Sequence, residues 1–198
     1  MDRSELLEIE LATLFGVSRI LRQPRPLEDT LARILQVLHD RGELLHGMVS
    51  LVDPDSGALL VNAVHGQHAL PDDEPVRYLP GEGLLGMVLE RGEQVVLPRI
   101  ADEPRFLNRL RLYDRELPFI GVPIRAGPEQ YSGVLAAQPP CRDQWLQERA
   151  RFLEMVANLI ARSVQTAREA ERERGALTAE RDSLRRAVRG HHGFDSMV

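Results

Sequence analysis

Lysine is absent from this chain, and cysteine occurs once. All 25 basic residues among the 198 are arginines. Without lysine the chain has neither a Schiff-base amine nor the lysine of a nucleotide-binding P-loop. The single thiol, Cys141, excludes an internal disulfide and a metal site built from cysteines. These absences argue against several classes of enzyme.

Long apolar runs and an excess of positive charge are also missing. No stretch approaches the roughly 18 consecutive apolar residues of a transmembrane helix, and the N-terminus lacks the apolar core of a secretory signal. The formal net charge is −5, which does not favour nucleic acid as a partner. We therefore expect a cytoplasmic protein that contacts neither membrane nor nucleic acid. The length suits one domain with extensions.

Apolar periodicity predicts an α+β domain. Helices are expected at residues 5–21, 27–41 and 81–91, and a helical turn or short helix at residues 102–112. Strands are expected at residues 47–52, 58–64, 76–79, 95–97, 119–124 and 131–138. This order predicts a central antiparallel sheet of five or six strands with helices on one face.

Both ends of the chain are predicted to be helices. The apolar stripe of the first one comprises Leu7, Leu11, Leu14, Val17 and Leu21. Pro24 and Pro26 end this helix, so we expect it to pack against a partner helix rather than in the main core. Three parts are predicted: an N-terminal helix at 1–24, a domain at 27–168 and a helical linker at 169–198.

One long helix is expected from residue 143 onward. Its first part has a wide apolar face that suits packing on a sheet. A ladder at heptad spacing, with polar breaks, then follows. Its members are Leu153, Val156, Ile160, Ser163, Ala167, Ala170, Arg174, Leu177, Arg181, Leu184 and Val188. The ladder predicts a homodimer formed through the terminal helices, and the alternative is a solvated tail.

Residues 79–125 are the stretch around which the chain is organised. Gly81 and Gly83 flank Glu82 directly before an apolar helical run that stops at Gly92. A glycine turn that opens a helix presents free backbone N–H groups and a positive helix end. The downstream arginines are Arg99, Arg105, Arg109 and Arg111. Two readings stay open: a small anion-binding pocket, or a helix capped by Glu82 and followed by a solvated loop.

Several segments in this order carry a resemblance to a known family. LPGEGLLGMVLERGE, followed by VVLPRIADEPRF and then by FIGVPIR and SGVLAAQ, resembles a GAF domain. The likeness continues through RFLEMVANLIARSV and ERDSLRRAVRGHHGFDSMV, and it resembles the N-terminal region of the NifA family of transcriptional activators of nitrogen-fixation operons. It covers about residues 35–198 and is weak before residue 27.

This resemblance implies a regulatory role. In the NifA family the GAF domain precedes an ATPase domain that works with sigma-54 polymerase, and then a helix-turn-helix domain. This chain contains no GxxxxGK[ST] motif, so we expect a sensor fragment. In some members the GAF domain responds to 2-oxoglutarate, and it tunes inhibition by NifL or by PII-type signalling proteins. Related activators of alternative nitrogenases carry N-terminal cysteines, which this chain lacks.

A dicarboxylate such as 2-oxoglutarate is therefore the expected ligand. A dianion is bound by guanidinium groups and backbone N–H groups. The residues expected to bind it are Arg77, Arg99, Arg105, Arg109 and Tyr113, together with the turn at Gly81 and Gly83. The alternative is a ligand-free module for dimerisation and protein contact, with a pocket filled by its own side chains.

Catalysis, a metal and a cofactor are not expected. GAF domains that reduce free methionine sulfoxide need several cysteines, and this chain has only Cys141. The signature of cyclic-nucleotide GAF domains includes a lysine, and this chain contains no lysine. No nucleophile stands at a readable spacing from a base, and the histidine spacings do not build a metal site.

Overall fold

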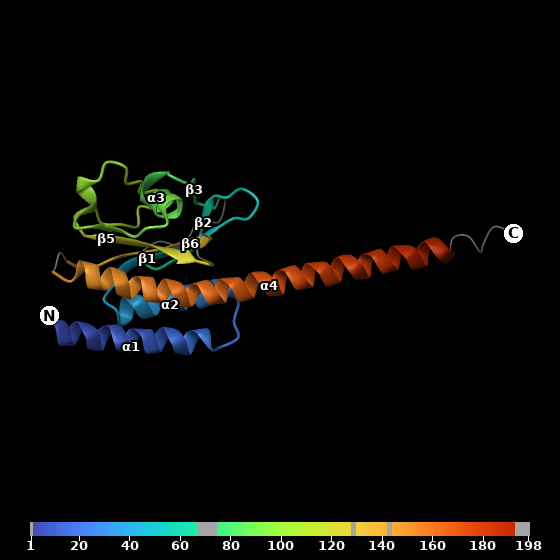
Figure 1. Ribbon diagram of the computed structural model, residues 1–198, viewed down its shortest axis with the longest axis horizontal. Coiled ribbons are helices and arrows are strands. Elements are labelled where there is room, and N and C mark those ends of the chain that lie inside the picture. Colours follow the sequence, from blue (N-terminus) through green and yellow to red (C-terminus); the bar gives the residue numbers. More distant parts are fainter. Residues whose placement is uncertain (1, 67–74, 128–129, 142–143, 193–198) are drawn as a thin grey trace. The chain divides into compact units, whose positions relative to one another are not determined.

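The computed structural model describes residues 2–66, 75–127, 130–141 and 144–192, with side chains along the last helix described to residue 178 and at residue 181. The chain forms two compact units, Met1–Ser163 and Val164–Val198. The first unit contains the sheet and the site described below (Figure 1).

A six-stranded antiparallel sheet forms the centre of the first unit and confirms the predicted α+β class. Its strands are β1 (Leu45–Val52), β2 (Leu59–Val64), β3 (Arg77–Tyr78), β4 (Val95–Leu97), β5 (Phe119–Arg125) and β6 (Tyr131–Gln138). They lie in the order β3-β2-β1-β6-β5-β4. Every predicted strand is present, with ends that differ by at most two residues. The two central strands pair from Leu45↔Gln138 to Leu51↔Gly133.

Helices cover both faces of this sheet rather than one face alone. Helix α3 (Gly83–Arg91) packs on β5 and β6, and α2 (Leu27–Asp40) packs on β1 and β2 from the opposite side (Figure 1). Side chains alternate along a strand, so Val134 belongs to the core beneath α3 while its neighbour Leu135 faces the other way. Both are fully buried, and the central strands therefore need a cover on each face.

Helix α1 (Arg3–Leu21) begins with a capping box formed by Asp2 and Glu5, and it packs on α2. Its buried residues are Leu6, Thr13, Gly16 and Val17. Leu7 and Leu11 of the predicted apolar stripe are exposed, so this part of the stripe does not face α2. Small side chains face α2 because the two helices approach closely; a Cβ on Gly16 would lie 3.0 Å from Val37.

Of the two alternatives predicted at residues 102–112, a helical turn or a short helix, the short helix is wrong. Only a 3₁₀ turn forms, at Ile100–Asp102, and the residues after it make turns. Local side chains compete for the backbone: the Glu103 carboxylate accepts a hydrogen bond from the Arg105 N–H at 3.1 Å. Arg111 adopts a φ of +51°, which a right-handed helix does not allow.

Helix α4 (Leu146–His192) starts three residues later than predicted and runs through both units. The sequence predicts an apolar face made of Phe152, Met155, Val156, Leu159 and Ile160. In the first unit Phe152, Val156 and Ile160 are buried as predicted, together with Leu153 and Ala157, but Met155 is wrong because it is 46% exposed. In the second unit Leu177 is exposed. The side chains of Leu184 and Val188 lie outside the described residues, so the pairing of the ladder stays a prediction. No helix in the described ranges has the length and apolarity to cross a membrane.

Candidate functional site

The glycine turn before α3 is closed by its own hydrogen bonds. Gly81 and Gly83 have φ angles of +77° and +60°, which glycine adopts without strain. The Gly81 N–H donates to the Gly86 carbonyl at 2.9 Å, and the Leu79 N–H donates to the Glu82 carboxylate at 2.8 Å. Glu82 occupies the N-cap position, as predicted, but its carboxylate binds the preceding turn instead of the helix. Part of the expected anion-binding capacity is thus used internally.

Arg109 ties the loop between β4 and β5 to this turn. Its guanidinium donates to the Arg77 carbonyl, forms an ion pair with Glu82 and lies 4.9 Å from the ring centroid of Tyr78. The hydrogen bond from Leu79 and the charge of Arg109 hold the pKa of Glu82 below its usual value. We call these groups the Arg109 latch. It brings the guanidinium of Arg109 to the predicted turn, and Arg77 takes part through its backbone carbonyl.

The other two predicted arginines are paired within the loop itself. Arg105 contacts Glu103 through two hydrogen bonds of 2.8 and 3.0 Å, and this pairing lowers the pKa of Glu103 to about 2. Arg99 binds Asp102 and, at 3.4 Å, Glu116. Because these pairs lie at the surface they are weak, and a ligand carboxylate can compete for either arginine.

Tyr113 lies in the core beneath α3 rather than at the loop surface. Its ring meets Phe106 and Phe119 edge-on, with centroids 5.9 and 5.4 Å away. The side chain is 8% exposed, and no described residue bonds its hydroxyl oxygen. Burial, with a smaller contribution from Tyr78, raises the pKa of Tyr113 well above its usual value. A buried hydroxyl without a partner is unfavourable by about 1–3 kcal/mol, so a ligand that accepts its hydrogen bond would stabilise the site.

Gln138, at the end of β6, fixes the part of the loop that follows Tyr113. Its side chain accepts a hydrogen bond from the Asp114 N–H at 2.9 Å, and donates to the Asp114 and Pro118 carbonyls at 2.7 and 3.1 Å. The residue is fully buried. Sequence reasoning missed it, because a glutamine at a strand end carries no distinctive signal. It links the loop directly to the strand that leads into α4.

The space between α3 and the sheet is filled by side chains of the chain itself. Its buried members are Met48, Leu59, Val61, Tyr78, Leu84, Leu85, Val88, Ile100, Leu112, Tyr113, Phe119, Val134 and Ala136. Phe106 and Leu110 are partly buried and pack against this cluster. An effector that reaches Tyr113 therefore has to displace part of this packing.

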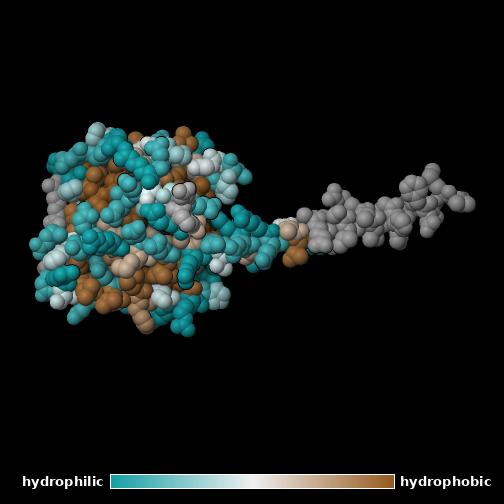
Figure 2. Space-filling view, viewed as in Figure 1, coloured by the Kyte–Doolittle hydropathy of each residue, from teal (hydrophilic) through white to brown (hydrophobic). Residues whose placement is uncertain are grey.

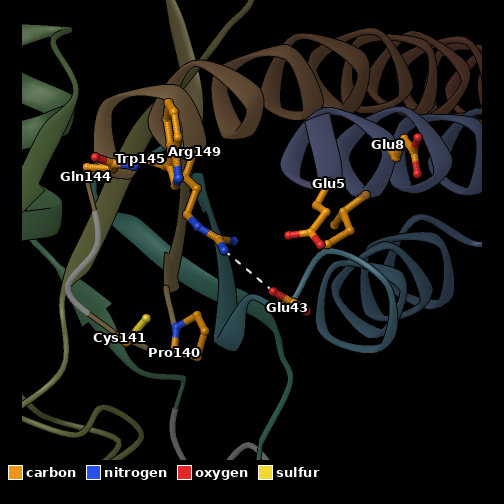
Figure 3. A pocket seen from close by; sticks show the side chains of 9 residues that line it. Glu5, Glu8, Glu43, Pro140, Cys141, Gln144, Trp145 and Arg149 are labelled. Atoms are coloured by element: carbon orange, nitrogen blue, oxygen red, sulfur yellow. Dashed lines mark ion pairs between the residues drawn. The ribbon is translucent and has the colours of Figure 1, made fainter. Parts of the chain in front are cut away.

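A separate groove of about 810 Å³ lies on the other side of the sheet, between the start of α1, the turn before β1 and the start of α4 (Figure 3). Acidic side chains, Trp145 and Arg149 line it. Arg149 is 2% exposed; it donates to the Gly42 carbonyl at 3.4 Å and forms an ion pair with Glu43 at 3.5 Å (Figure 3). Glu43 itself has a φ of +53°.

Sequence reasoning missed this groove. The sequence feature that could have indicated it is Arg149, which lies three residues before Phe152 at the edge of the apolar face of α4. Burial raises the pKa of nearby Glu10, while Arg149 acts in the opposite direction. Within the described ranges, no three side chains of histidine, cysteine, aspartate or glutamate are grouped so as to hold a metal ion.

Comparison with known proteins adds the family. The model of the family described as "GAF domain" matches residues 26–164. The chain is 47% identical, over 98% of its length, to a Nif-specific regulatory protein of Azotobacter vinelandii, and 40% identical, over 97%, to one of Enterobacter agglomerans. It spans 38% and 37% of the length of these relatives. Their names agree with the prediction of a regulatory rather than a catalytic domain.

Solved structures share the fold. The GAF domain of A. aeolicus nlh2, in an inactive state, superposes with a TM-score of 0.72 over 81% of this chain and 98% of that one. The sequence identity is 21%, so the likeness concerns the fold alone.

Proposed function

Because the chain belongs to the GAF domain family, we propose that it is the regulatory input domain of a NifA-type activator of nitrogen-fixation genes. In this role it binds a small effector, a NifL-like or PII-type regulatory protein, or both. It thereby controls an ATPase domain that acts on sigma-54 polymerase. The proposal includes the cytoplasmic location expected from the sequence. The similarity to Nif-specific regulatory proteins along nearly the whole chain supports it.

The proposed effector is 2-oxoglutarate, bound between the Arg109 latch and Tyr113. The observation that carries this proposal is the buried, unpartnered hydroxyl of Tyr113. The Tyr78 ring connects the two ends of the site, since Arg109 lies over it and Tyr78 belongs with Tyr113 to the buried cluster beneath α3. One ligand carboxylate would bind Arg109 and the other would accept the hydrogen bond of Tyr113.

Glu82 holds the place of a ligand carboxylate while the site is empty. It forms the same kind of ion pair with Arg109 that a dicarboxylate would form. Binding then exchanges one carboxylate for another, and the charge of Arg109 stays compensated throughout. Gly81, Gly83, Arg77, Arg99 and Arg105 complete the proposed set of contacts around this exchange.

The loop provides a route from this exchange to α4. Gln138 binds the backbone on both sides of residues 115–117, so a shift of Tyr113 is passed to the end of β6. The chain leaves β6 and enters α4 at Leu146. A small displacement at the site can thus bias the start of the long helix.

Isothermal titration of the 198-residue chain with 2-oxoglutarate tests this proposal, with succinate and glutamate as controls. We expect saturable binding of 2-oxoglutarate alone. Arg105→Ala combined with Arg109→Ala, and separately Tyr113→Phe, should each weaken binding about tenfold or more, because each removes a hydrogen bond to a charged group. Glu82→Gln should strengthen binding, since it removes the competing carboxylate.

A matched control is Arg33→Ala on α2, which removes another surface arginine paired with an aspartate. Its affinity should equal that of the unmodified chain. Unchanged affinity in a folded Arg105→Ala, Arg109→Ala variant would overturn the assignment of these arginines.

The filled core beneath α3 favours a second candidate function. A domain whose interior is packed by its own aromatic side chains needs no ligand to be stable. In this alternative the chain is a dimerisation and protein-interaction module. Absence of saturable 2-oxoglutarate binding to the folded chain, together with binding of a regulatory protein, would support it.

In both cases we propose that the chain forms a homodimer through its terminal helices. The exposed Leu177 in the second unit belongs to the predicted heptad ladder, and this supports pairing of α4 with a second copy.

A further inference from the structure

A hollow of about 320 Å³ lies between α1 and α2, in the first unit. Figure 2 shows apolar side chains gathered on the surface over α1, whereas most of the side chains that line this hollow are polar. None of the described residues that line it is acidic. Four arginines and two glutamines do so, namely Arg19, Arg25, Arg33, Arg41, Gln23 and Gln36. We call this site the arginine hollow.

Helical spacing and one glycine build the arginine hollow. On α2, Arg33, Val37 and Arg41 stand at i, i+4 and i+8, which places them in one row. On α1, Arg19 comes almost one turn after Gly16. A Cβ on Gly16 would lie 3.0 Å from a methyl group of Val37 and 3.8 Å from Cδ of Arg41. The two helices therefore bring arginines to one shared space.

One aspartate compensates only part of the charge around this hollow. Asp29 pairs with Arg25 and with Arg33, each at 3.1 Å. Within the described ranges no ion pair contains Arg19 or Arg41. Arg19 lies in the last turn of α1, where the helix end carries only about half a negative charge. Four guanidinium groups and one carboxylate leave an excess of positive charge at a concave surface.

This excess occurs in a chain whose net charge is −5. Like charges that share a concave surface repel one another, and a bound anion relieves this repulsion. Guanidinium is the side-chain group best suited to bind phosphate and carboxylate oxygens. We propose that the arginine hollow binds a small anion that carries two adjacent phosphate groups. It is separate from the effector site proposed above, and neither site depends on the other.

The directions of the arginines favour phosphate over carboxylate. They come from α1, from α2 and from the segment that joins the two helices. A tetrahedral phosphate directs its oxygens to several sides, whereas a planar carboxylate presents two oxygens on one side. A phosphate group also carries a charge of about −1.5 to −2 at pH 7, more than one carboxylate. A central anion that serves several guanidinium groups is therefore a phosphate.

The size and the lining of the hollow define the rest of the ligand. Pockets for small molecules span about 300–1,000 Å³, so this one is at the lower end and still exceeds a single phosphate group. No aromatic ring is among the described residues that line it, so a nucleobase finds no stacking partner. We therefore assign the binding to the phosphate groups alone, with two of them bridging Arg19 on α1 and Arg41 on α2.

Isothermal titration of the 198-residue chain with inorganic pyrophosphate tests this assignment. We expect saturable binding at one site per chain. Arg19→Gln combined with Arg41→Gln should weaken it about tenfold or more, because the variant removes two charged hydrogen-bond donors. Both residues are exposed, so the variant should fold normally. Inorganic phosphate and citrate should each bind about tenfold or more weakly than pyrophosphate, since one lacks the second phosphate group and the other has only carboxylates.

A matched control is Arg3→Gln combined with Arg91→Gln. It removes the same charge at exposed positions outside the hollow, and should leave the affinity for pyrophosphate unchanged. Equal losses in the two double variants would mean general attraction of anions and overturn the site. Absence of saturable binding to the folded chain would overturn it as well. Citrate that binds as tightly as pyrophosphate would overturn the preference for phosphate.

Urea unfolding provides a second measurement. An anion that binds α1 and α2 together stabilises the folded chain by mass action, so pyrophosphate should raise the urea midpoint. It should raise the midpoint of the Arg3→Gln, Arg91→Gln variant equally, and that of the Arg19→Gln, Arg41→Gln variant much less. The same shift in both variants would contradict binding in the hollow.

The 2-oxoglutarate titration separates this inference from the proposed function. Arg19→Gln with Arg41→Gln should leave the affinity for 2-oxoglutarate unchanged, because α1 and α2 lie on the face of the sheet opposite α3. Loss of 2-oxoglutarate binding with intact pyrophosphate binding would overturn only the sensor function. Displacement of pyrophosphate by 2-oxoglutarate would place both anions in one site and overturn the assignment of a separate phosphate site.

Discussion

On the α3 face of the sheet, Arg99, Arg105 and Arg109 are 36–54% exposed, whereas on the opposite face Arg149 is 2% exposed. All four pair with glutamate or aspartate. The exposed arginines bind acids that water also reaches, so each pair contributes little to stability. Water does not reach the Arg149 guanidinium in this way. Arg149 is buried, and it contacts the Gly42 carbonyl and the Glu43 carboxylate.

The exposed arginines and the buried arginine therefore have different roles. An exposed ion pair exchanges its partner at a small change in free energy, and this suits a site where a ligand carboxylate replaces Glu82. A buried arginine keeps its partners, since removing them leaves the guanidinium without solvation. Arg149 therefore positions the start of α4 beside the turn at Gly42 and Glu43.

Arg149→Met should show the largest effect. The variant keeps much of the aliphatic stem but removes the contacts to Gly42 and Glu43. Loss of one partner of a fully buried pair destabilises by about 3–5 kcal/mol. Glu43 is half exposed and regains water, so we expect the lower value of about 2–3 kcal/mol, measured by urea unfolding.

Glu43→Gln is the matched control for Arg149. It keeps a polar group of the same size at the exposed end of the pair, and should cost less than about 1 kcal/mol. Equal losses for the two variants would mean that the ion pair, rather than burial of the guanidinium, carries the stability.

Tyr113→Phe should have the next largest effect, and of the opposite sign. The ring contacts to Phe106 and Phe119 stay, while the unpartnered hydroxyl is removed. Relief of a buried unsatisfied group should stabilise the empty domain by about 1 kcal/mol. The same variant should lose effector affinity. Destabilisation on urea unfolding would show that the hydroxyl has a partner, and would remove the main support for the effector site.

Elements whose signals lie in the local sequence could be predicted, whereas features that depend on packing could not. All six strands were predicted because their apolar runs are bounded by proline, glycine or polar turns, and α1 and α2 because proline separates them. At 102–112 turns form rather than a short helix, because local hydrogen bonds, such as that from the Arg105 N–H to Glu103, outweigh helix propensity. In α1 the pattern identified the helix but not its direction of packing, because close approach at Gly16 selects the smaller face.

The candidate site was less accessible to sequence reasoning. The glycine turn identified the start of α3, and the Arg109 guanidinium donates there to the backbone carbonyl of Arg77. Tyr113 was expected at the surface with the arginines, since nothing in the local sequence distinguishes a loop tyrosine that turns inward. Arg149 and Gln138 were missed because their importance comes from burial, which depends on segments distant in the chain.

The Arg109 latch should contribute less than either buried group. Arg109→Ala and Glu82→Gln should each destabilise by less than about 1 kcal/mol, because both side chains are about a third exposed. A double-mutant cycle gives the coupling between them, which we expect to be about 0.5 kcal/mol and to fall at high salt. A coupling above about 2 kcal/mol would contradict the exchange of Glu82 for a ligand, because the latch would then be too strong to open.

The smallest effect is a pH dependence of opposite sign on the two faces. The pKa of Glu103 is lowered from 4.5 to about 2, so its contribution to stability is present above the unfolded value and is lost as pH falls through the folded value. Burial raises the pKa of Glu10, so its contribution is fully present below 4.5 and is lost as pH rises through the raised value.

Glutamine variants isolate the two contributions. Near pH 7, Glu103→Gln should be less stable than the unmodified chain and Glu10→Gln more stable, each by less than about 1 kcal/mol. Both differences should shrink as the pH is lowered, since the unmodified glutamates become protonated; that of Glu10 disappears first because its pKa is the higher. Urea midpoints measured between about pH 3 and 7 check this order. If both variants shift stability in the same direction near pH 7, the difference between the two faces does not lie in solvation of their charges.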